Sequence, residues 1–340
     1  MPLTNAMDLA QILTESWLIE NYPWTLQIPR AWAWRGIAGS KLIFPRTAKM
    51  TTFGSVGTGT CDSEIPDQTN QVESTPEFEL VSLLTRYSIC MGDVDRIRDP
   101  QLLDRVLWEL AKIRLLYTYF ERVGKVNSTV SQFPGLPDIV GAGQTIDMAT
   151  ASLTFAAVDQ AYRLVVSNQG RPNAIMSNRR ALRTFASMYF TGGGGEPNKV
   201  LDTWMDPIRG QVTAEITAFN GTPWYINDLI PDDEPEPGTE TGTIFFMVLG
   251  DDSGPGPYRG ITGIVPQGLE SNWFVKRQAN GISGTQMLTV PAGGGVFAIT
   301  PPTLPTVDTF VSWPTGLAMG AQGALSILKG FRLIADLPTT

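Results

Sequence analysis

Residues 99–124 restrict the possible folds of this chain more than any other stretch. Asp99 is suited to cap a helix, Pro100 to occupy its first position, and Gly124 to end it. The stretch therefore predicts a helix of about 36 Å, long for a globular protein. Its apolar residues recur at helical spacing and extend around much of the circumference: Leu103, Val106, Leu107, Leu110, Ile113, Tyr117 and Phe120, with Ala111, Leu115, Leu116, Tyr119 and Val123 beside them. Such a helix must be covered on more than one side.

Composition indicates a protein whose surface is partly covered in its working state. The 340 residues suffice for a large core and for one to three domains. Charged residues make up only 17% of the chain, below the usual share of roughly 25%. Gly 34 and Pro 25 favour turns and extended segments over a helical bundle. The net charge of −8 argues against binding of nucleic acid through bulk positive charge.

The residue types needed for several common active sites are missing. The chain has no histidine, which excludes Ser-His-Asp and Cys-His nucleophilic sites, histidine-ligated zinc and HExxH sites. Cys61 and Cys90 are too few for a disulfide framework. The acidic segment 231–238 could hold a cation, but its prolines favour a solvated loop. We expect no catalytic residues, cofactor or metal. We also expect no leader sequence and no membrane span.

Residues 1–37 predict a segment that must dock on something. They are too few for a domain and too apolar to remain in water, and they predict a short amphipathic helix at 7–19. Docking within the chain and docking on a neighbouring subunit both remain open. The charges in and just after that helix are acidic, which disfavours a membrane surface. The segment holds four of the nine tryptophans, namely Trp17, Trp24, Trp32 and Trp34.

Two extended runs at 41–53 and 78–89 flank a polar middle at 54–70 and predict a long β-hairpin. An isolated hairpin is marginally stable in water, so we expect it to lie across a partner. An ordinary edge hairpin or lid is the alternative.

The rest of the chain predicts alternating helices and strands. A helix is expected at 149–167, a strand at 174–177, and a helix at 179–188 capped by Asn178. Asn220 and Gly221 form a hairpin-type turn between strands at 214–219 and 222–226. Further strands are expected at 243–249, 261–277 and 287–300. The fold class is therefore α+β.

The order of these pieces resembles the major capsid proteins of tailed phages, which have the Hong Kong 97-like fold shared with encapsulins. Short motifs carry the resemblance: the run from Phe78 into residues 86–95 before the long helix, then Phe133-Pro-Gly-Leu136 after it. The others are Asn173 to Leu182, Gly221 to Asp228, and Leu249-Gly-Asp251.

The resemblance implies a division of the chain. Residues 1–37 would be an N-terminal arm and 38–80 an extended E-loop hairpin lying over a neighbouring subunit. Residues 81–125 and 263–318 would form a peripheral domain containing the spine helix 99–124. Residues 126–262 and 319–340 would form an axial domain. Candidate residues for assembly interfaces are Trp17, Trp24, Arg46, Lys49, Glu73, Arg86 and Arg96.

The function implied is that of a structural protein rather than an enzyme. Hexamers and pentamers of the chain would close into an icosahedral shell around a double-stranded DNA genome, in a virion assembled in the host cytoplasm. Separate scaffolding, portal and decoration proteins would be partners, and a membrane would not. An encapsulin-like nanocompartment shell is the alternative, and an unrelated enzyme using carboxylates is a third hypothesis.

The sequence departs from some members of this family in the lysines of the hairpin. Those members cross-link a lysine of the E-loop to an asparagine of a neighbour. No lysine lies between Lys49 and Lys112 here, so we expect no covalent mesh.

Overall fold

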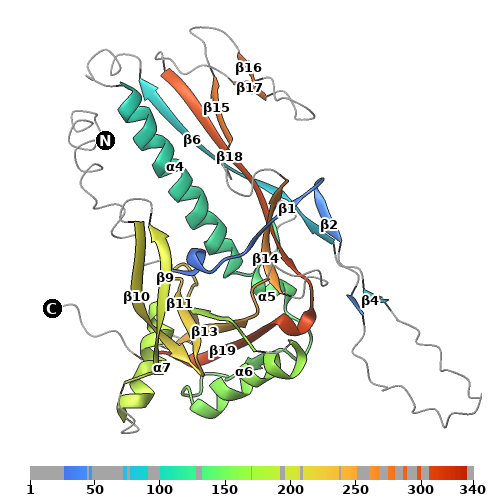
Figure 1. Ribbon diagram of the computed structural model, residues 1–340, viewed down its shortest axis with the longest axis vertical. Coiled ribbons are helices and arrows are strands. Elements are labelled where there is room, and N and C mark those ends of the chain that lie inside the picture. The colour runs from blue at the N-terminus through green and yellow to red at the C-terminus, as the bar shows by residue number, and fades with distance from the viewer. Residues whose placement is uncertain are drawn as a thin grey trace, which may run out of the picture.

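The computed structural model describes residues 27–43, 46–47, 72–74, 77–90, 100–127, 132–169, 171–191, 196–206, 210–236, 239–250, 260–267, 275–279, 286–288, 297–299 and 306–334. Within these ranges a long helix lies beside a five-stranded sheet, and its lower end meets an eight-stranded sheet (Figure 1). The chain is therefore mixed α and β, as the sequence predicted.

The long helix α4 (Pro100–Val123) matches its predicted span almost to the residue. Its C-terminal half is the more deeply buried part, with Tyr119, Phe120 and Val123 fully enclosed. Gly124 directly follows the helix and packs against Ile230, whose Cγ1 would lie only 2.8 Å from a Cβ on Gly124. The glycine is thus required by close approach, and not by the left-handed conformation that often ends helices.

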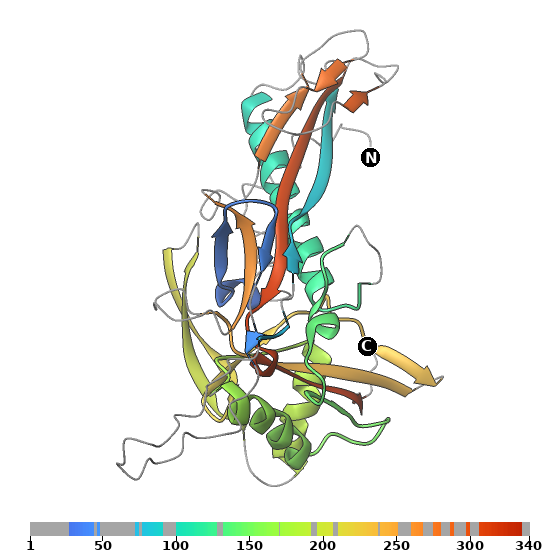
Figure 2. The same ribbon diagram turned by 90° about the vertical axis from the view of Figure 1, so that its right-hand side faces the viewer.

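The five-stranded sheet packs one face on α4. Its order is β1 (Trp34–Ile37), β14 (Ile261–Pro266), β18 (Thr306–Met319) and β15 (Val275–Ala279), and β6 (Val81–Cys90) also pairs with β18. Strands β6 and β18 are antiparallel and run along α4 in both views (Figures 1 and 2). Alternate residues of these two strands, including Leu83, Val311 and Trp313, are buried in the core that contains the helix.

The expected hairpin pairs as antiparallel strands at its base. Strand β2 (Lys41–Ile43) pairs with β5 (Glu77–Glu79), and β3 (Arg46–Thr47) pairs with β4 (Val72–Ser74). The hairpin leaves the five-stranded sheet at the start of β6 and projects from the body of the molecule (Figure 1). The polar middle at 54–70 lies outside the described residues.

The eight-stranded sheet has buried side chains on both faces. Its order is β7 (Thr145–Asp147), β19 (Leu325–Arg332), β13 (Thr239–Met247), β8 (Ala174–Ser177), β11 (Thr222–Ile226), β10 (Gly210–Phe219) and β9 (Lys199–Asp206), with β12 (Asp233–Glu236) also on β13. Helices α6 (Phe155–Gln169) and α7 (Arg179–Thr191) pack on one face, against Ile175 and Phe246. Met176 and Phe245 point to the other face, toward the end of α4.

The remaining elements are short. They are the 3-10 turns η2 (Ile28–Arg30) and η3 (Gln322–Ala324), the helix α5 (Leu136–Ile139), and a pair of strands, β16 (Gln286–Leu288) and β17 (Phe297–Ile299).

Two sequence expectations were wrong in detail. Helix α6 begins at Phe155 and not at 149, because Ala149 and Thr150 have φ angles of 46° and 68°. The Thr154 hydroxyl then accepts a hydrogen bond from the Ala157 amide at 3.2 Å, as an N-cap does. The acidic segment is also not a simple loop, since residues 233–236 form β12 and pair with β13.

Candidate functional site

The core of the molecule contains the last part of the expected N-terminal arm. Trp32 is 6% exposed, and its Nε1 donates a hydrogen bond to the Tyr119 hydroxyl at 3.2 Å. That hydroxyl donates in turn to the carbonyl oxygen of Gly316 in β18, also at 3.2 Å. Burial raises the pKa of Tyr119, so the phenol stays protonated. Trp34 adds a ring contact to Trp313, with centroids 5.3 Å apart.

Residues 27–37 therefore dock on the core of their own chain. The backbone amide of Gln27 donates to the Ile226 carbonyl at 2.7 Å, which fixes the point where the segment enters the core. Trp17 and Trp24 lie outside the described residues, as do Lys49 and Arg96. Residues 27–37 are thus held by contacts within their own chain.

Three of the candidate interface residues fall on described strands. Arg46 on β3 and Glu73 on β4 belong to the outer part of the hairpin. Arg86 is exposed on β6, opposite Phe310 of β18, well away from the hairpin strands. The structure therefore places these candidates on different elements, β3 and β4 of the hairpin and β6 of the five-stranded sheet.

The base of the hairpin has one buried and one exposed face. Phe78 is 3% exposed and pairs with Leu42, and together they anchor the hairpin to the core. Lys41 lies on the other face, with Nζ 2.6 Å from a carboxylate oxygen of Glu79 and 3.1 Å from one of Glu77. Hydrogen bonds to Glu79 and then Glu77 raise the pKa of Lys41.

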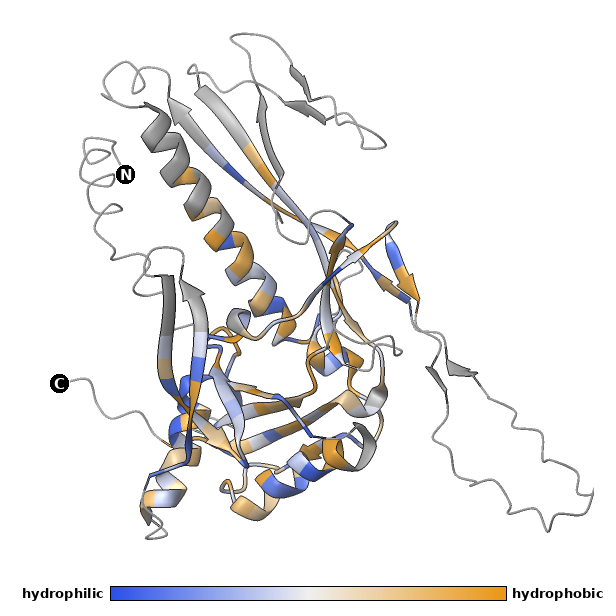
Figure 3. Cartoon of the chain, in the orientation of Figure 1, coloured by the Kyte–Doolittle hydropathy of each residue, from blue (hydrophilic) through white to orange (hydrophobic). Residues whose placement is uncertain are grey.

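Several large apolar side chains are exposed that the sequence analysis did not single out. Leu84 on β6 is 66% exposed and Ile43 on the hairpin is 54% exposed. Figure 3 shows apolar colour on β2, which projects from the main body. Alternation along the strands could have indicated these residues, but only the packing shows which face is open. The others are Val126, Phe155, Val166, Phe190, Leu201 and Ile334.

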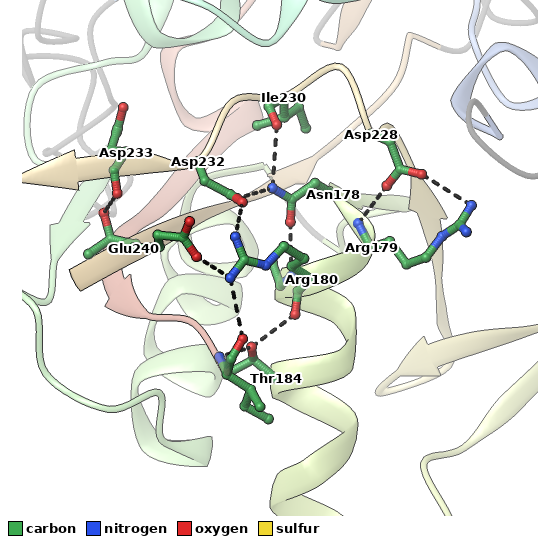
Figure 4. A network of polar contacts seen from close by, with 12 residues as sticks. Asn178, Arg179, Arg180, Thr184, Asp228, Ile230, Asp232, Asp233 and Glu240 are labelled. Carbon is green, nitrogen blue, oxygen red and sulfur yellow. Dashed lines mark hydrogen bonds and ion pairs between the residues drawn. The ribbon is translucent and has the colours of Figure 1, made fainter. Parts of the chain in front are cut away.

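A polar network ties the start of α7 to the edge of the eight-stranded sheet (Figure 4). Asn178 caps the helix as predicted, since its Oδ1 accepts a hydrogen bond from the Ala181 amide at 2.9 Å. Arg180 forms ion pairs with Asp232, at 2.7 Å, and with Glu240. The hydrogen bond from Arg180 lowers the pKa of Glu240.

A second ion pair, between Arg179 and Asp228, lies at the start of α7. Asp228 accepts a hydrogen bond from the Arg179 amide at 2.8 Å, and its other carboxylate oxygen lies 3.1 Å from the Arg179 guanidinium. Burial nevertheless raises the pKa of Asp228 above its usual value. The network therefore anchors a helix and is a structural feature.

The described residues contain no group of three or more side chains that could bind a metal ion together. No helix among them is long and apolar enough to cross a membrane.

No protein family model matches the sequence, and no curated protein matches it either. Solved structures do match the fold. A chain of the holo-SrpI encapsulin complex from Synechococcus elongatus PCC 7942 aligns with a TM-score of 0.61 at 14% identity, over 92% of this chain and 90% of that one. The chain has the fold of encapsulin and capsid subunits. This confirms the resemblance found in the sequence.

Two further structures with this fold come from particles of other kinds. A chain from Mycobacterium phage Adephagia aligns with a TM-score of 0.53 at 14% identity, over 90% of this chain and 89% of that one. A capsid chain of the native GTA particle aligns with a TM-score of 0.51 at 13% identity, over 89% of each chain. At these identities the likeness establishes the encapsulin and capsid fold, and function must be argued separately.

Proposed function

We propose that this chain is a major capsid protein that assembles into an icosahedral shell enclosing a double-stranded DNA genome. The observation that carries the proposal is the extent of the structural match, which covers about nine-tenths of this chain and of each related chain. A match of this extent leaves too little of the chain for a separate catalytic domain. The chain would act as a structural protein and not as an enzyme.

The physical features of the subunit support a role in assembly. An isolated hairpin is marginally stable in water, and a neighbouring subunit would supply contacts beyond the base that Phe78 and Leu42 anchor. Exposed apolar residues such as Leu84 and Phe190 would likewise be covered in a shell. Head-to-tail contacts of this kind close into the pentamers and hexamers of an icosahedral particle.

The division of the chain that we propose is the one implied by the resemblance. The arm would comprise residues 1–37, with its last part held in the core, and the E-loop residues 38–80. The peripheral domain would comprise 81–125 and 263–318, and the axial domain 126–262 and 319–340.

The net charge of −8 would keep the wall from adhering to the DNA it encloses, with no sequence-specific binding. The shell would be part of a virion assembled in the host cytoplasm. Scaffolding, portal and decoration proteins would be its partners.

An encapsulin-like compartment is the second candidate. The TM-score of 0.61 for the encapsulin chain, against 0.53 and 0.51 for the phage and GTA chains, favours it. The contents of purified particles distinguish the two. Nuclease-resistant double-stranded DNA would support the virion, and a co-purifying protein without DNA would support the compartment.

Electron microscopy and light scattering of the purified chain test the proposal itself. We expect closed particles of uniform size under conditions that permit assembly. A protein that remains monomeric with and without its co-expressed neighbouring genes would contradict both shell functions.

A further inference from the structure

The turn between strands β10 and β11 contains a chemically reactive pair of residues. Asn220 and Gly221 connect Phe219 to Thr222, which lie opposite each other in the two strands. Both turn residues are exposed and have positive φ angles, 50° for Asn220 and 74° for Gly221, as a two-residue hairpin turn requires. Asparagine followed by glycine deamidates more readily than other asparagines, because the glycine has no side chain to hinder attack by its own nitrogen.

The deamidation reaction needs no partner other than water. The backbone nitrogen of Gly221 attacks Cγ of the Asn220 side chain, and the new C–N bond closes a five-membered succinimide ring. The side-chain amide leaves as ammonia and takes the proton of the attacking nitrogen. Water then opens the ring at either carbonyl carbon. One product has aspartate at position 220, and the other has isoaspartate, whose backbone runs through the former side chain.

The guanidinium of Arg171 is hydrogen-bonded to this turn. Its Nη2 donates to the backbone carbonyl oxygen of Asn220. The two groups are so close that a Cβ on Gly221 would lie 2.6 Å from the same Nη2. Hydrogen bonds from a charged donor are stronger than those between neutral groups. Arg171 therefore resists any motion that moves this carbonyl oxygen.

A chain of hydrogen bonds fixes the position of Arg171. Its Nε donates to the hydroxyl of Tyr162 at 3.2 Å. That hydroxyl lies 3.4 Å from Oγ1 of Thr222, and Thr222 donates to the carbonyl of Pro172 at 2.9 Å. Because the Thr222 proton is directed at Pro172, Tyr162 is the donor to Thr222. Tyr162 and Thr222 are both buried, so the chain of bonds anchors the exposed guanidinium to the core.

Ring closure requires a rotation that Arg171 opposes. The Gly221 nitrogen approaches Cγ of Asn220 only when the bond between Cα and the carbonyl carbon of Asn220 rotates out of the left-handed conformation. That rotation moves the carbonyl oxygen away from the guanidinium. We propose that Asn220 is a deamidation site and that Arg171 is a positioning residue that keeps it unreactive in the folded chain. This protection does not depend on assembly into a shell.

Conversion to isoaspartate would weaken the strand that receives the N-terminal segment. It lengthens the backbone of a turn that has only two residues between the paired Phe219 and Thr222. Strand β11 begins at this turn and ends at Ile226, whose carbonyl accepts the hydrogen bond from the Gln27 amide at 2.7 Å. The subunit would therefore lose stability as isoaspartate accumulates.

Mass spectrometry of peptides from the aged, purified chain tests the protection. Chromatography separates the peptides that have asparagine, aspartate or isoaspartate at position 220. In urea, Asn220 should deamidate at a rate similar to that of Asn280, which is also followed by glycine and lies outside the described residues. In the folded chain Asn220 should react more slowly than in urea by about tenfold or more. Equal rates for Asn220 in the folded chain and in urea would overturn the proposal.

Replacement of Arg171 tests its role. Arg171→Ala and Arg171→Lys should each accelerate deamidation of Asn220 in the folded chain by about tenfold, because neither side chain has the planar fork that holds the carbonyl and Tyr162 together. The matched control is Arg163→Ala, which removes an exposed arginine that pairs with Asp159 on α6 and should leave the rate unchanged. The parent rate in Arg171→Ala, or in Arg171→Lys, would overturn the positioning role.

A variant destabilised elsewhere separates opening of the turn from unfolding of the whole subunit. Tyr119→Phe removes buried hydrogen bonds of α4, in a different core cluster from Tyr162. Under conditions in which circular dichroism shows the variant folded, Asn220 should deamidate at the parent rate. Acceleration as large as in Arg171→Ala would mean that the reaction proceeds through global unfolding, and it would refute direct protection by Arg171.

Discussion

The Nε1 group of Trp32 donates a hydrogen bond to the buried hydroxyl of Tyr119, over 3.2 Å. Residues 87 positions apart in sequence thereby join the N-terminal region to the long helix. Tyr119 also donates to the carbonyl of Gly316. Its hydroxyl therefore connects the N-terminal segment, α4 and β18 in the core between the helix and the five-stranded sheet. Buried polar groups that are fully paired fix a unique arrangement, whereas unpaired ones are costly.

Replacing Tyr119 by Phe should lower the free energy of unfolding by about 1–3 kcal/mol. The aromatic ring stays, but the Trp32 donor and the Gly316 carbonyl both lose their partner. Urea unfolding of the unassembled subunit measures the loss. Tyr117→Phe, on the same helix but only half-buried, is the control. An equal loss in both variants would mean that the hydrogen bonds of Tyr119 contribute little.

Tryptophans on either side of Gln27 should behave differently when replaced. Trp32→Ala removes a buried ring that contacts Phe120 with centroids 5.3 Å apart, and it should cost about 3–5 kcal/mol of folding free energy. Trp24→Asp and Trp17→Asp should leave the subunit folded and stop assembly. Circular dichroism and sedimentation together separate folding from assembly. Unfolded Trp24→Asp would place that part of the arm in the core of its own subunit.

Gly135 occupies a site with no room for a side chain. A Cβ there would lie 1.9 Å from the Lys125 carbonyl oxygen and 2.7 Å from that of Arg122. Both obstacles are backbone atoms at the end of α4, so Gly135→Ala should destabilise the subunit by about 3 kcal/mol or more. Gly250→Ala is the matched control, because its nearest contact would be an ordinary 3.4 Å. Comparable unfolding free energies for the two variants would contradict this account.

Local signals in the sequence were enough to predict several elements. Helix α4 and strand β8 lie where expected, because capping residues, a glycine and apolar periodicity act over a few neighbouring positions. The cap at Asn178 was predicted for the same reason. The start of α6 was misplaced, since the positive φ angles of Ala149 and Thr150 are set by surrounding contacts and not by residue type.

Long-range contacts could not be read from the sequence. Nothing local distinguishes Trp32, which lies in the core, from Trp24, which is outside the described residues. Likewise the exposure of Ile43 and Leu84 depends on which face of each strand packs, a property of the whole fold. Arg86 was a candidate through its proximity in sequence to the hairpin, and the structure shows that it lies on a separate face.

The ion pair between Glu240 and Arg180 should make the folding stability depend on pH in the acidic range. Its folded-state pKa is lowered from 4.5, so its contribution is present above about pH 4.5 and is lost as the pH falls through the lowered value. Urea midpoints of the parent chain and Glu240→Gln should therefore differ at about pH 6 and converge at about pH 3.

Asp228 also makes the stability depend on pH, but it is present in both the parent chain and Glu240→Gln. The difference between these two chains therefore reports on Glu240. Burial raises the pKa of Asp228, so its contribution has the opposite sign and is lost as the pH rises. Glu215→Gln removes the same charge near Lys199 and serves as the control. If the urea midpoints of the parent chain and Glu240→Gln differ by the same amount from about pH 6 to about pH 3, the ion pair between Arg180 and Glu240 does not contribute as described.

Mature particles should contain no covalent links between subunits. Lys41 and Lys49 are the lysines of residues 38–80, and Lys41 is held between Glu77 and Glu79, which raise its pKa and keep the amine protonated. A protonated amine is not a nucleophile, so Lys41 is poorly suited to attack a side-chain amide. Boiled particles should therefore give one band at 37.1 kDa in denaturing gels. Ladders that persist in reductant, and disappear in Lys49→Arg, would show that Lys49 supplies a cross-link after all.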